Sequence, residues 1–282
     1  MRLSVSSYSF THYLDQTGAR YFEICDIAKQ MGFDGIEFTT LSSKYFDKEA
    51  DELAMAEALR AYCESIGLEI CAYAVGADIF ANRQAAVEEV CAHVDAARAL
   101  GAKLLRFDVC YSLPADCSHD QAIEQMAPYI RQIADYAQGK GVRVCTENHG
   151  YVFQAPDVVE RLMLAVDHAN YGWLCDVGNF LCVDADPESA VATAMTYCCH
   201  VHFKDFLWES RNKPRPTGYF GTLGGNHLKG TMLGHGIVPL ESCAAILKRS
   251  GYDGWVSLEF EGTEDCLTAI SEGLAFLKAH VL

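Results

Sequence analysis

The chain has 282 residues, about half of them apolar, which is enough to bury one large core. Its 38 acidic and 22 basic residues give a formal net charge of −16, which argues against a nucleic-acid-binding protein because phosphate contacts depend on Lys and Arg. The 13 cysteines have no paired spacing, so we expect small buried thiols in a reducing compartment and neither a disulfide framework nor a zinc ribbon.

Short apolar or β-branched runs alternate with longer segments of helical period along the whole chain. This pattern is typical of repeated βα units around a parallel sheet. We expect strands at residues 3–10, 35–39, 68–75, 103–109, 142–147, 171–176, 199–204 and 255–259, with amphipathic helices between them. Glycines such as Gly67 and Gly101 follow the expected helices, where they end a helix with little strain. The sequence therefore predicts an α/β fold, a (β/α)8 TIM barrel forming a single domain over residues 1–282.

One stretch, residues 207–233, departs from the alternating pattern and contains Pro214 and Pro216. We predict a long loop insertion here, after the seventh strand. Connections of this length are often functional, and in a barrel this one lies on the face that carries the active site. Two interpretations are open: a lid over the substrate, or else a family-specific decoration or oligomer contact.

Four acidic and histidine residues end, or nearly end, the last four expected strands: Glu147, Asp176, His202 and Glu259. Active sites of TIM barrels form at the carboxyl ends of the strands. One such residue alone is more often a helix cap or a core side chain, but several carboxylates brought together repel one another unless a cation compensates. Three carboxylates and one imidazole suit one divalent metal ion, such as Mn, Mg, Co or Zn. We therefore predict a metal-binding enzyme.

Further polar residues near the same strand ends are predicted to bind the substrate: Arg106, His149, Asn179, Lys204 and His235. For Arg106 and Lys204 the alternative is a structural ion pair, and for His235 it is an ordinary loop position. Glu261 shares a strand face with Glu259 and is the alternative ligand at this end of the chain.

The most distinctive motifs are Glu-Asn-His-Gly at 147–150, Asp-Val-Gly-Asn at 176–179, His-Val-His-Phe-Lys-Asp at 200–205 and the segment from Gly251 to Gly262. They resemble those of the sugar phosphate isomerase/epimerase superfamily, which has the xylose isomerase-like TIM barrel, and the resemblance covers essentially the whole chain. It implies that Glu147, Asp176, His202 and Glu259 hold the metal. It also implies that Glu147 and Glu259 are catalytic, as the acceptor and donor of a proton beside a metal-stabilised enediolate.

The resemblance implies an isomerase or epimerase of a small sugar, sugar acid or inosose-type ketone, acting in carbohydrate metabolism. The alternative is a dehydratase of the inosose or 3-dehydroshikimate type on the same scaffold. Ketose 3-epimerases of the family carry a His where this chain has Asn179, and an Arg shortly after the His ligand, where this chain has none before Trp208. These departures disfavour a free ketohexose as the substrate.

Two further interpretations are weaker. An endonuclease IV-type nuclease is expected to carry additional His ligands, and neither residues 35–40 nor residues 68–77 contain one. A sugar-binding barrel without catalysis would keep the pocket and lose the chemistry. We expect a small-molecule sugar or polyol ketone as the substrate and no nucleic-acid or membrane partner, and the family leaves a homo-oligomer open. The short polar N-terminus and the lack of a membrane-length apolar run predict a cytoplasmic protein.

Overall fold

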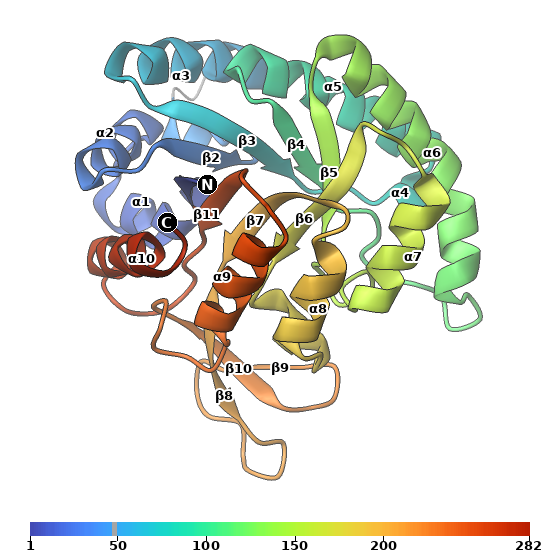
Figure 1. Ribbon diagram of the computed structural model, residues 1–282. Coiled ribbons are helices and arrows are strands. Elements are labelled where there is room, and N and C mark those ends of the chain that lie inside the picture. Colours follow the sequence, from blue (N-terminus) through green and yellow to red (C-terminus); the bar gives the residue numbers. More distant parts are fainter. Residues whose placement is uncertain (47–49) are drawn as a thin grey trace.

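The structure is a computed structural model that describes residues 1–46 and 50–282. In these residues eight parallel strands close into a barrel, and helices cover its outer surface (Figure 1). The barrel strands are β1 (Arg2–Ser6), β2 (Gly35–Thr39), β3 (Glu69–Val75), β4 (Leu104–Phe107), β5 (Arg143–Glu147), β6 (Tyr171–Asp176), β7 (Cys198–Phe203) and β11 (Trp255–Leu258). They follow one another around the barrel in sequence order, and β11 pairs with both β7 and β1. The predicted TIM barrel is confirmed.

Ten α-helices and three 3-10 helices lie in the described ranges. The α-helices are α1 (Thr11–Thr17), α2 (Tyr21–Met31), α3 (Glu52–Ile66), α4 (Ile79–Asn82), α5 (Gln84–Leu100), α6 (His119–Lys140), α7 (Pro156–Val166), α8 (Pro187–Ala194), α9 (Leu240–Arg249) and α10 (Cys266–His280). The 3-10 helices are η1 (Ser7–Phe10), η2 (Ser43–Tyr45) and η3 (Asn179–Val183). Local sequence sets the helix ends: α6 starts with a capping box of Ser118 and Gln121 and stops at Gly141 in the left-handed conformation.

The inner face of the barrel is apolar at its floor and polar at its mouth. Side chains of a strand alternate between two faces, so Cys145 and Glu147 of β5 share the inner face. A small cluster of buried side chains from neighbouring strands fills the floor: Cys71, Ala72, Leu104, Cys145 and Leu174, with Cys199 and Trp255 packed against them. A Cβ atom on Gly35 would lie 2.8 Å from the Trp255 ring, so a glycine is needed beside this ring.

The strand predictions agree with the structure to within a residue or two, apart from the first. Residues 3–10 were expected as one strand, but β1 ends at Ser6 and η1 follows. The hydroxyl of Ser6 accepts a hydrogen bond from the backbone N–H of Tyr8, which favours a turn over an extended chain. This turn brings Tyr8 to the barrel mouth and leaves Phe10 fully buried in the core.

The stretch after β7 folds into a three-stranded antiparallel sheet of β8 (Asp205–Glu209), β10 (His227–Thr231) and β9 (Phe220–Gly221). This inserted sheet projects from the barrel on the side of β7 and α9 (Figure 1). The carboxylate of Asp184, which follows η3, accepts hydrogen bonds from Thr222 Oγ1 at 2.9 Å, Gly224 N at 2.6 Å and Asn226 Nδ2 at 2.7 Å. Hydrogen bonds therefore fix the inserted sheet against the loop after β6.

A single buried carboxylate fixes both ends of the inserted sheet. Asp205 accepts four backbone N–H groups, those of Phe206, Gly234, Gly236 and Val238, at 2.8 to 3.1 Å. Asp205 also pairs directly with Thr231 across β8 and β10. The chain thus leaves the barrel and returns to it at one place.

Two properties expected from composition can be compared with the structure. The 13 cysteines are all free, and most of them are buried. Within residues 1–46 and 50–282, the helices are too short or too polar for one of them to cross a membrane.

Candidate active site

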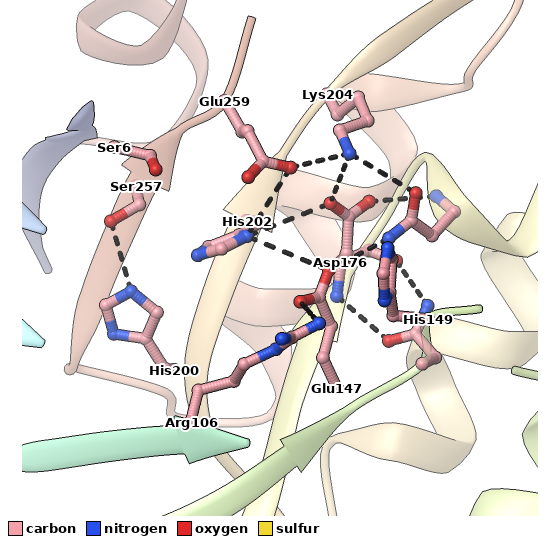
Figure 2. Close-up of polar contacts among 12 residues, drawn as sticks. Ser6, Arg106, Glu147, His149, Asp176, His200, His202, Lys204, Ser257 and Glu259 are labelled. Atoms are coloured by element: carbon pink, nitrogen blue, oxygen red, sulfur yellow. Dashed lines mark hydrogen bonds and ion pairs between the residues drawn. The ribbon is translucent and has the colours of Figure 1, made fainter. Parts of the chain in front are cut away.

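Four side chains from neighbouring strands meet at the mouth of the barrel: Glu147, Asp176, His202 and Glu259, here called the four-residue cluster. Glu147 and Asp176 end β5 and β6, His202 lies one residue before the end of β7, and Glu259 directly follows β11. Because β6 and β7 pair in parallel, Asp176 and His202 are directly paired across the two strands. His202 Nδ1 lies 3.9 Å from Glu147 Oε1, 3.8 Å from Asp176 Oδ2 and 3.8 Å from Glu259 Oε2 (Figure 2).

The cluster fits a divalent cation. One ligand atom from each residue lies within 4.8 Å of all the others, and ligands bound to one ion at about 2.0–2.2 Å lie at most about 4.4 Å apart. Asp176 Oδ2 and His202 Nδ1 are buried and have no hydrogen-bond partner among the described residues. Such orphaned buried atoms are costly unless a bound ion or water satisfies them. Oxygen and imidazole ligands without thiolates suit Mn, Mg, Co or Zn.

Backbone hydrogen bonds orient the Asp176 carboxylate. Asp176 Oδ1 accepts the N–H groups of Gly178 and Asn179, each at 2.8 Å, and this leaves Oδ2 facing the cluster. Burial raises the pKa of Asp176, and the carboxylates of Glu147 and Glu259 raise it further, so that it reaches about 7 despite the nearby Lys204. A bound cation would remove this repulsion.

Two buried cations flank the cluster. Arg106 Nη2, at the end of β4, lies 2.8 Å from Glu147 Oε2, and Lys204 Nζ lies 2.5 Å from Glu259 Oε2. Burial opposes the charge of Glu259, but Lys204 and His202 outweigh it and lower the pKa of that carboxyl. The ion-pair alternative considered for Arg106 and Lys204 is thus present, and both side chains also line the pocket.

The two glutamates differ in how their oxygens are occupied. Glu147 Oε1 accepts a hydrogen bond from Asn179 Nδ2 at 2.9 Å, and its Oε2 faces Arg106. Glu259 has its contacts with Lys204 and His202 at Oε2, and in the described part of the chain no hydrogen bond is found at its Oε1. Glu259 therefore has one oxygen without a partner among the described side chains, whereas each oxygen of Glu147 has one.

His149 stands on the wall of the pocket beside Glu147 (Figure 2). Its Nδ1 lies 3.0 Å from Asp108 Oδ1, and the same carboxylate pairs with Arg106 at 2.8 Å. Burial disfavours the imidazolium, but the hydrogen bond to Asp108 and the charge of Glu147 outweigh burial and raise the pKa of His149. Its neighbour Asn148 is fully buried and hydrogen-bonds the backbone of Asp176, so only His149 faces the cavity.

The cluster opens into a cavity of about 230 Å³. Its walls come from the carboxyl ends of the strands and the loops after them: Tyr8, Glu37, Thr39, Thr40, Ala74, Val75, Gly76, Arg106, Glu147, His149, His202, Lys204, Glu259 and Glu261. Such a volume holds a small ring or a short sugar. A larger hollow of about 450 Å³ lies at the opposite end of the barrel, among helix C-termini and exposed cations such as Arg98 and Lys103, and contains none of the cluster residues.

The other predicted residues are placed as follows. Asn179 is buried behind Glu147 and contacts both that carboxylate and, at 3.4 Å, Lys204. His235 follows the inserted sheet, has a side chain 54% exposed and lies 3.9 Å from Glu272, away from the cavity. Glu261 lines the cavity 3.5 Å from Lys204 but is not part of the four-residue cluster, which contains Glu259.

Sequence reasoning missed Glu37, which is fully buried beneath the cluster. Its Oε2 lies 3.0 Å from His202 Nε2 and 2.8 Å from His200 Nε2. An acidic residue between Ile36 and Phe38 in an otherwise apolar strand was the available signal, because an acid is almost never fully buried without a partner.

Comparison with known proteins agrees with this fold. A family model described as the xylose isomerase-like TIM barrel matches residues 25–280. The chain is 24% identical over 143 residues to an inosose dehydratase of Lacticaseibacillus casei, a match that covers 50% of the chain and 48% of that protein. The chain thus spans about half the length of the curated relatives it matches first.

Solved structures with the same fold have diverse descriptions. The probable 3-DHS dehydratase AsbF of Bacillus anthracis superposes with a TM-score of 0.76 at 22% identity and covers 99% of both chains. The IolI protein with a bound zinc atom superposes with a TM-score of 0.79 at 16% identity, and the match covers 100% of this chain and 98% of the IolI chain. An L-ribulose 3-epimerase superposes with a TM-score of 0.74 at 17% identity, and the match covers 99% of this chain and 94% of the epimerase chain. At these identities the likeness supports the fold alone.

Proposed function

Because this chain belongs to the xylose isomerase-like TIM barrel family, we propose that it is a divalent-metal-dependent dehydratase, a lyase that removes water from a small cyclic polyol ketone. The metal ligands in this proposal are Glu147, Asp176, His202 and Glu259. A bound divalent ion supplies Lewis-acid stabilisation of negative charge on the substrate's carbonyl oxygen. A dehydratase is thus preferred to the isomerase or epimerase that the sequence resemblance implied.

The proposal rests on a difference between the partners of the two glutamates' carboxylate oxygens. Epimerisation through an enediolate needs two groups that exchange protons with the same carbon from opposite faces. Both oxygens of Glu147 already have partners, Arg106 and Asn179, whereas Glu259 keeps Oε1 unengaged. One available glutamate, with His149 on the cavity wall, suits an elimination, which needs one base and one acid that act at different atoms.

The proposed reaction balances with these residues. Glu259 Oε1 accepts the proton from the carbon next to the carbonyl. The electron pair left on that carbon forms the new double bond as the C–O bond to the β-hydroxyl breaks. His149 donates a proton to the departing hydroxyl, which leaves as water, and the product is an enone. Lys204 and Arg106 balance the negative charge that develops near the cluster.

The comparisons support this choice of reaction class. The curated relatives are inosose dehydratases, and AsbF is described as a probable 3-DHS dehydratase. A cyclic β-hydroxy ketone of one of these two kinds is therefore the proposed substrate class. The epimerase remains the second candidate, because Glu147 and Glu259 come from strands on either side of Asp176 and His202 and the fold is shared with an L-ribulose 3-epimerase.

A substrate panel in deuterated buffer separates the two candidates. The metal-loaded chain is incubated with inososes, 3-dehydroshikimate and ketohexoses. A dehydratase gives a new ultraviolet-absorbing enone from a cyclic ketone, whereas an epimerase gives a deuterium-labelled stereoisomer of a ketose without loss of water. The Glu259→Gln variant serves as the inactive control. Labelled epimer without enone would reject the dehydratase.

A further inference from the structure

A buried carboxylate lies directly beneath the four-residue cluster and belongs to neither the cluster nor the proposed reaction. Glu37, on β2, has a side chain with no exposed surface. Three donors converge on its Oε2: His202 Nε2 at 3.0 Å, His200 Nε2 at 2.8 Å and Ser257 Oγ at 3.3 Å. A buried charge is tolerated only when it is paired and hydrogen-bonded, and these donors compensate the charge at Oε2, while Oε1 is buried without a hydrogen-bond partner among the described residues.

The two nitrogens of His202 face different partners. Nε2 lies 3.0 Å from Glu37 Oε2. Nδ1 faces the three carboxylates of the cluster (Figure 2). A carboxylate can only accept a hydrogen bond, so the proton of a neutral His202 lies on Nε2, and Nδ1 presents its lone pair to the cluster. Nδ1 has no hydrogen-bond partner in the described residues, as expected of a ligand atom.

Neighbouring groups hold Glu37 in place. Ser257 Oγ also hydrogen-bonds Ser4 Oγ at 2.6 Å and His200 Nε2 at 3.1 Å, so the donors on Glu37 are themselves connected. The ring of His200 lies nearly perpendicular to that of His202, with the ring centroids 5.4 Å apart. His200 is too far below the cluster to join it and contacts Glu37 instead. The result is a closed network around one oxygen.

We propose that Glu37 is a positioning residue that fixes the orientation and tautomer of His202 and thereby sets the affinity of the cluster for its metal ion. This inference rests on the proposed metal site. Groups that hydrogen-bond the second nitrogen of a metal-bound His orient the ring and raise its basicity, and their removal typically costs about 10- to 100-fold in metal affinity.

A second metal ion at Glu37, Cys71 and His200 is the competing interpretation, because ligand atoms of these residues also lie within 4.8 Å of one another. His200 Nε2 lies 2.8 Å from Glu37 Oε2 and hydrogen-bonds Ser257 Oγ at 3.1 Å, so this nitrogen already has partners in the protein. Glu37 Oε2 has a further partner in His202 Nε2, at 3.0 Å. The structure therefore favours one ion per chain with Glu37 in a supporting position.

The test compares four full-length chains freed of metal: wild type, Glu37→Gln, Glu37→Asp and Ser257→Ala. Calorimetric titration with Co²⁺ gives the Kd and the number of ions, the visible absorption of bound Co²⁺ gives its ligand geometry, and circular dichroism shows that each chain is folded. Glu37→Asp keeps the charge that pairs with the histidines but is one methylene too short to reach His202. It also remains informative if Glu37→Gln does not fold. Ser257→Ala removes a bond from the same buried network, and the Ser257 side chain makes no hydrogen bond to His202.

We expect one Co²⁺ per wild-type chain, with the Kd raised about 10- to 100-fold and the visible bands altered in Glu37→Asp, and a smaller rise in Glu37→Gln, whose amide oxygen still accepts a hydrogen bond. Ser257→Ala should lose stability while raising the Kd less than Glu37→Asp does, because both histidines still contact Glu37. A folded Glu37→Asp chain with the wild-type Kd, or two Co²⁺ per wild-type chain, overturns the proposal. If Co²⁺ binding responds as expected but no substrate turns over, the positioning role stands and only the proposed function fails.

Discussion

Arg106 Nη2 lies 2.8 Å from Glu147 Oε2, which joins the end of β4 to the first carboxylate of the four-residue cluster. The same nitrogen lies 2.8 Å from Asp108 Oδ1, and Nη1 bonds the other Asp108 oxygen at 3.0 Å. One guanidinium thus orients both a proposed metal ligand and the partner of His149.

Arg106→Lys should lower kcat/KM by about 10- to 100-fold, because an ammonium cannot reproduce the planar pairing with two carboxylates. The matched control is Arg161→Lys. Arg161 also pairs with two aspartates, Asp120 and Asp157, but on the exposed surface, where such pairs contribute about 0–1 kcal/mol. Steady-state kinetics of both variants measure the difference in kcat/KM. If both variants lose kcat/KM equally, Arg106 has no role in the active site.

Replacing Glu259 and Glu261 separately should distinguish the ligand from its neighbour. Glu259 belongs to the four-residue cluster, whereas Glu261 lines the cavity wall. We expect Glu259→Gln to lower metal affinity by about 100-fold or more and Glu261→Gln to keep the metal. Elemental analysis after dialysis measures the bound ion. If only Glu261→Gln loses the metal, Glu261 is the ligand and Glu259 is not.

Chelation should abolish turnover and lower the thermal midpoint of unfolding. Three carboxylates repel one another in the ion-free cluster, and burial together with this repulsion raises the pKa of Asp176. An ion present at 100 times its Kd stabilises the folded chain by about 2.7 kcal/mol. Differential scanning calorimetry with EDTA and after re-addition of Mn²⁺ measures the shift. Full activity in chelated, metal-free protein would exclude a metal-dependent reaction.

The pH dependence of turnover should report on His149 and Asp108. A His149 that donates a proton must be protonated, so the rate falls as pH rises through its pKa. Asp108 holds that pKa above its usual range, so Asp108→Asn lowers it and moves the alkaline limb of kcat toward lower pH. His149→Asn should remove this limb and leave a low, flat rate. An unchanged profile in Asp108→Asn would assign the limb to another group.

Gly236→Ala should lower the free energy of unfolding by about 1–3 kcal/mol, as expected when a methyl group is forced into filled space. A Cβ atom at Gly236 would lie 2.1 Å from Asp205 Oδ1 and 2.4 Å from Phe206 O. Gly139→Ala is the matched control, because Gly139 lies in α6 with no atom within 4 Å of its Cβ position. It should stabilise the chain by about 0.5–1 kcal/mol. Urea unfolding compares the two.

The barrel and the four cluster residues could be predicted because both depend on local patterns. β2 and β6 were predicted to the residue, since each is a short buried run with a clear start and end. A residue that ends a parallel strand must lie at the mouth of the barrel, so Glu147 and Asp176 could be placed from their position in the chain alone.

Other features depend on contacts between distant segments. Glu37 meets His202 across 165 residues, and only closure of the barrel brings β2 and β7 to face each other. The inserted sheet escaped prediction because β9 has two residues, too few for a periodic signal, and because the turn between β9 and β10 is held by hydrogen bonds to the distant Asp184. The glycines on either side of His235 did not show where its side chain points, and in the structure this side chain is exposed and lies away from the cavity.

The arrangement around Asp205 has a consequence for how such a barrel can diversify. Both ends of the inserted sheet meet at this one carboxylate, so the segment between them can be lengthened, shortened or exchanged without moving β7 or β11. Chimeras joined beside Asp205 and Thr231 would therefore change the inserted sheet while retaining the residues that line the cavity, none of which lies between these two positions in the described part of the chain. The fold in effect separates a replaceable module from a fixed reaction centre.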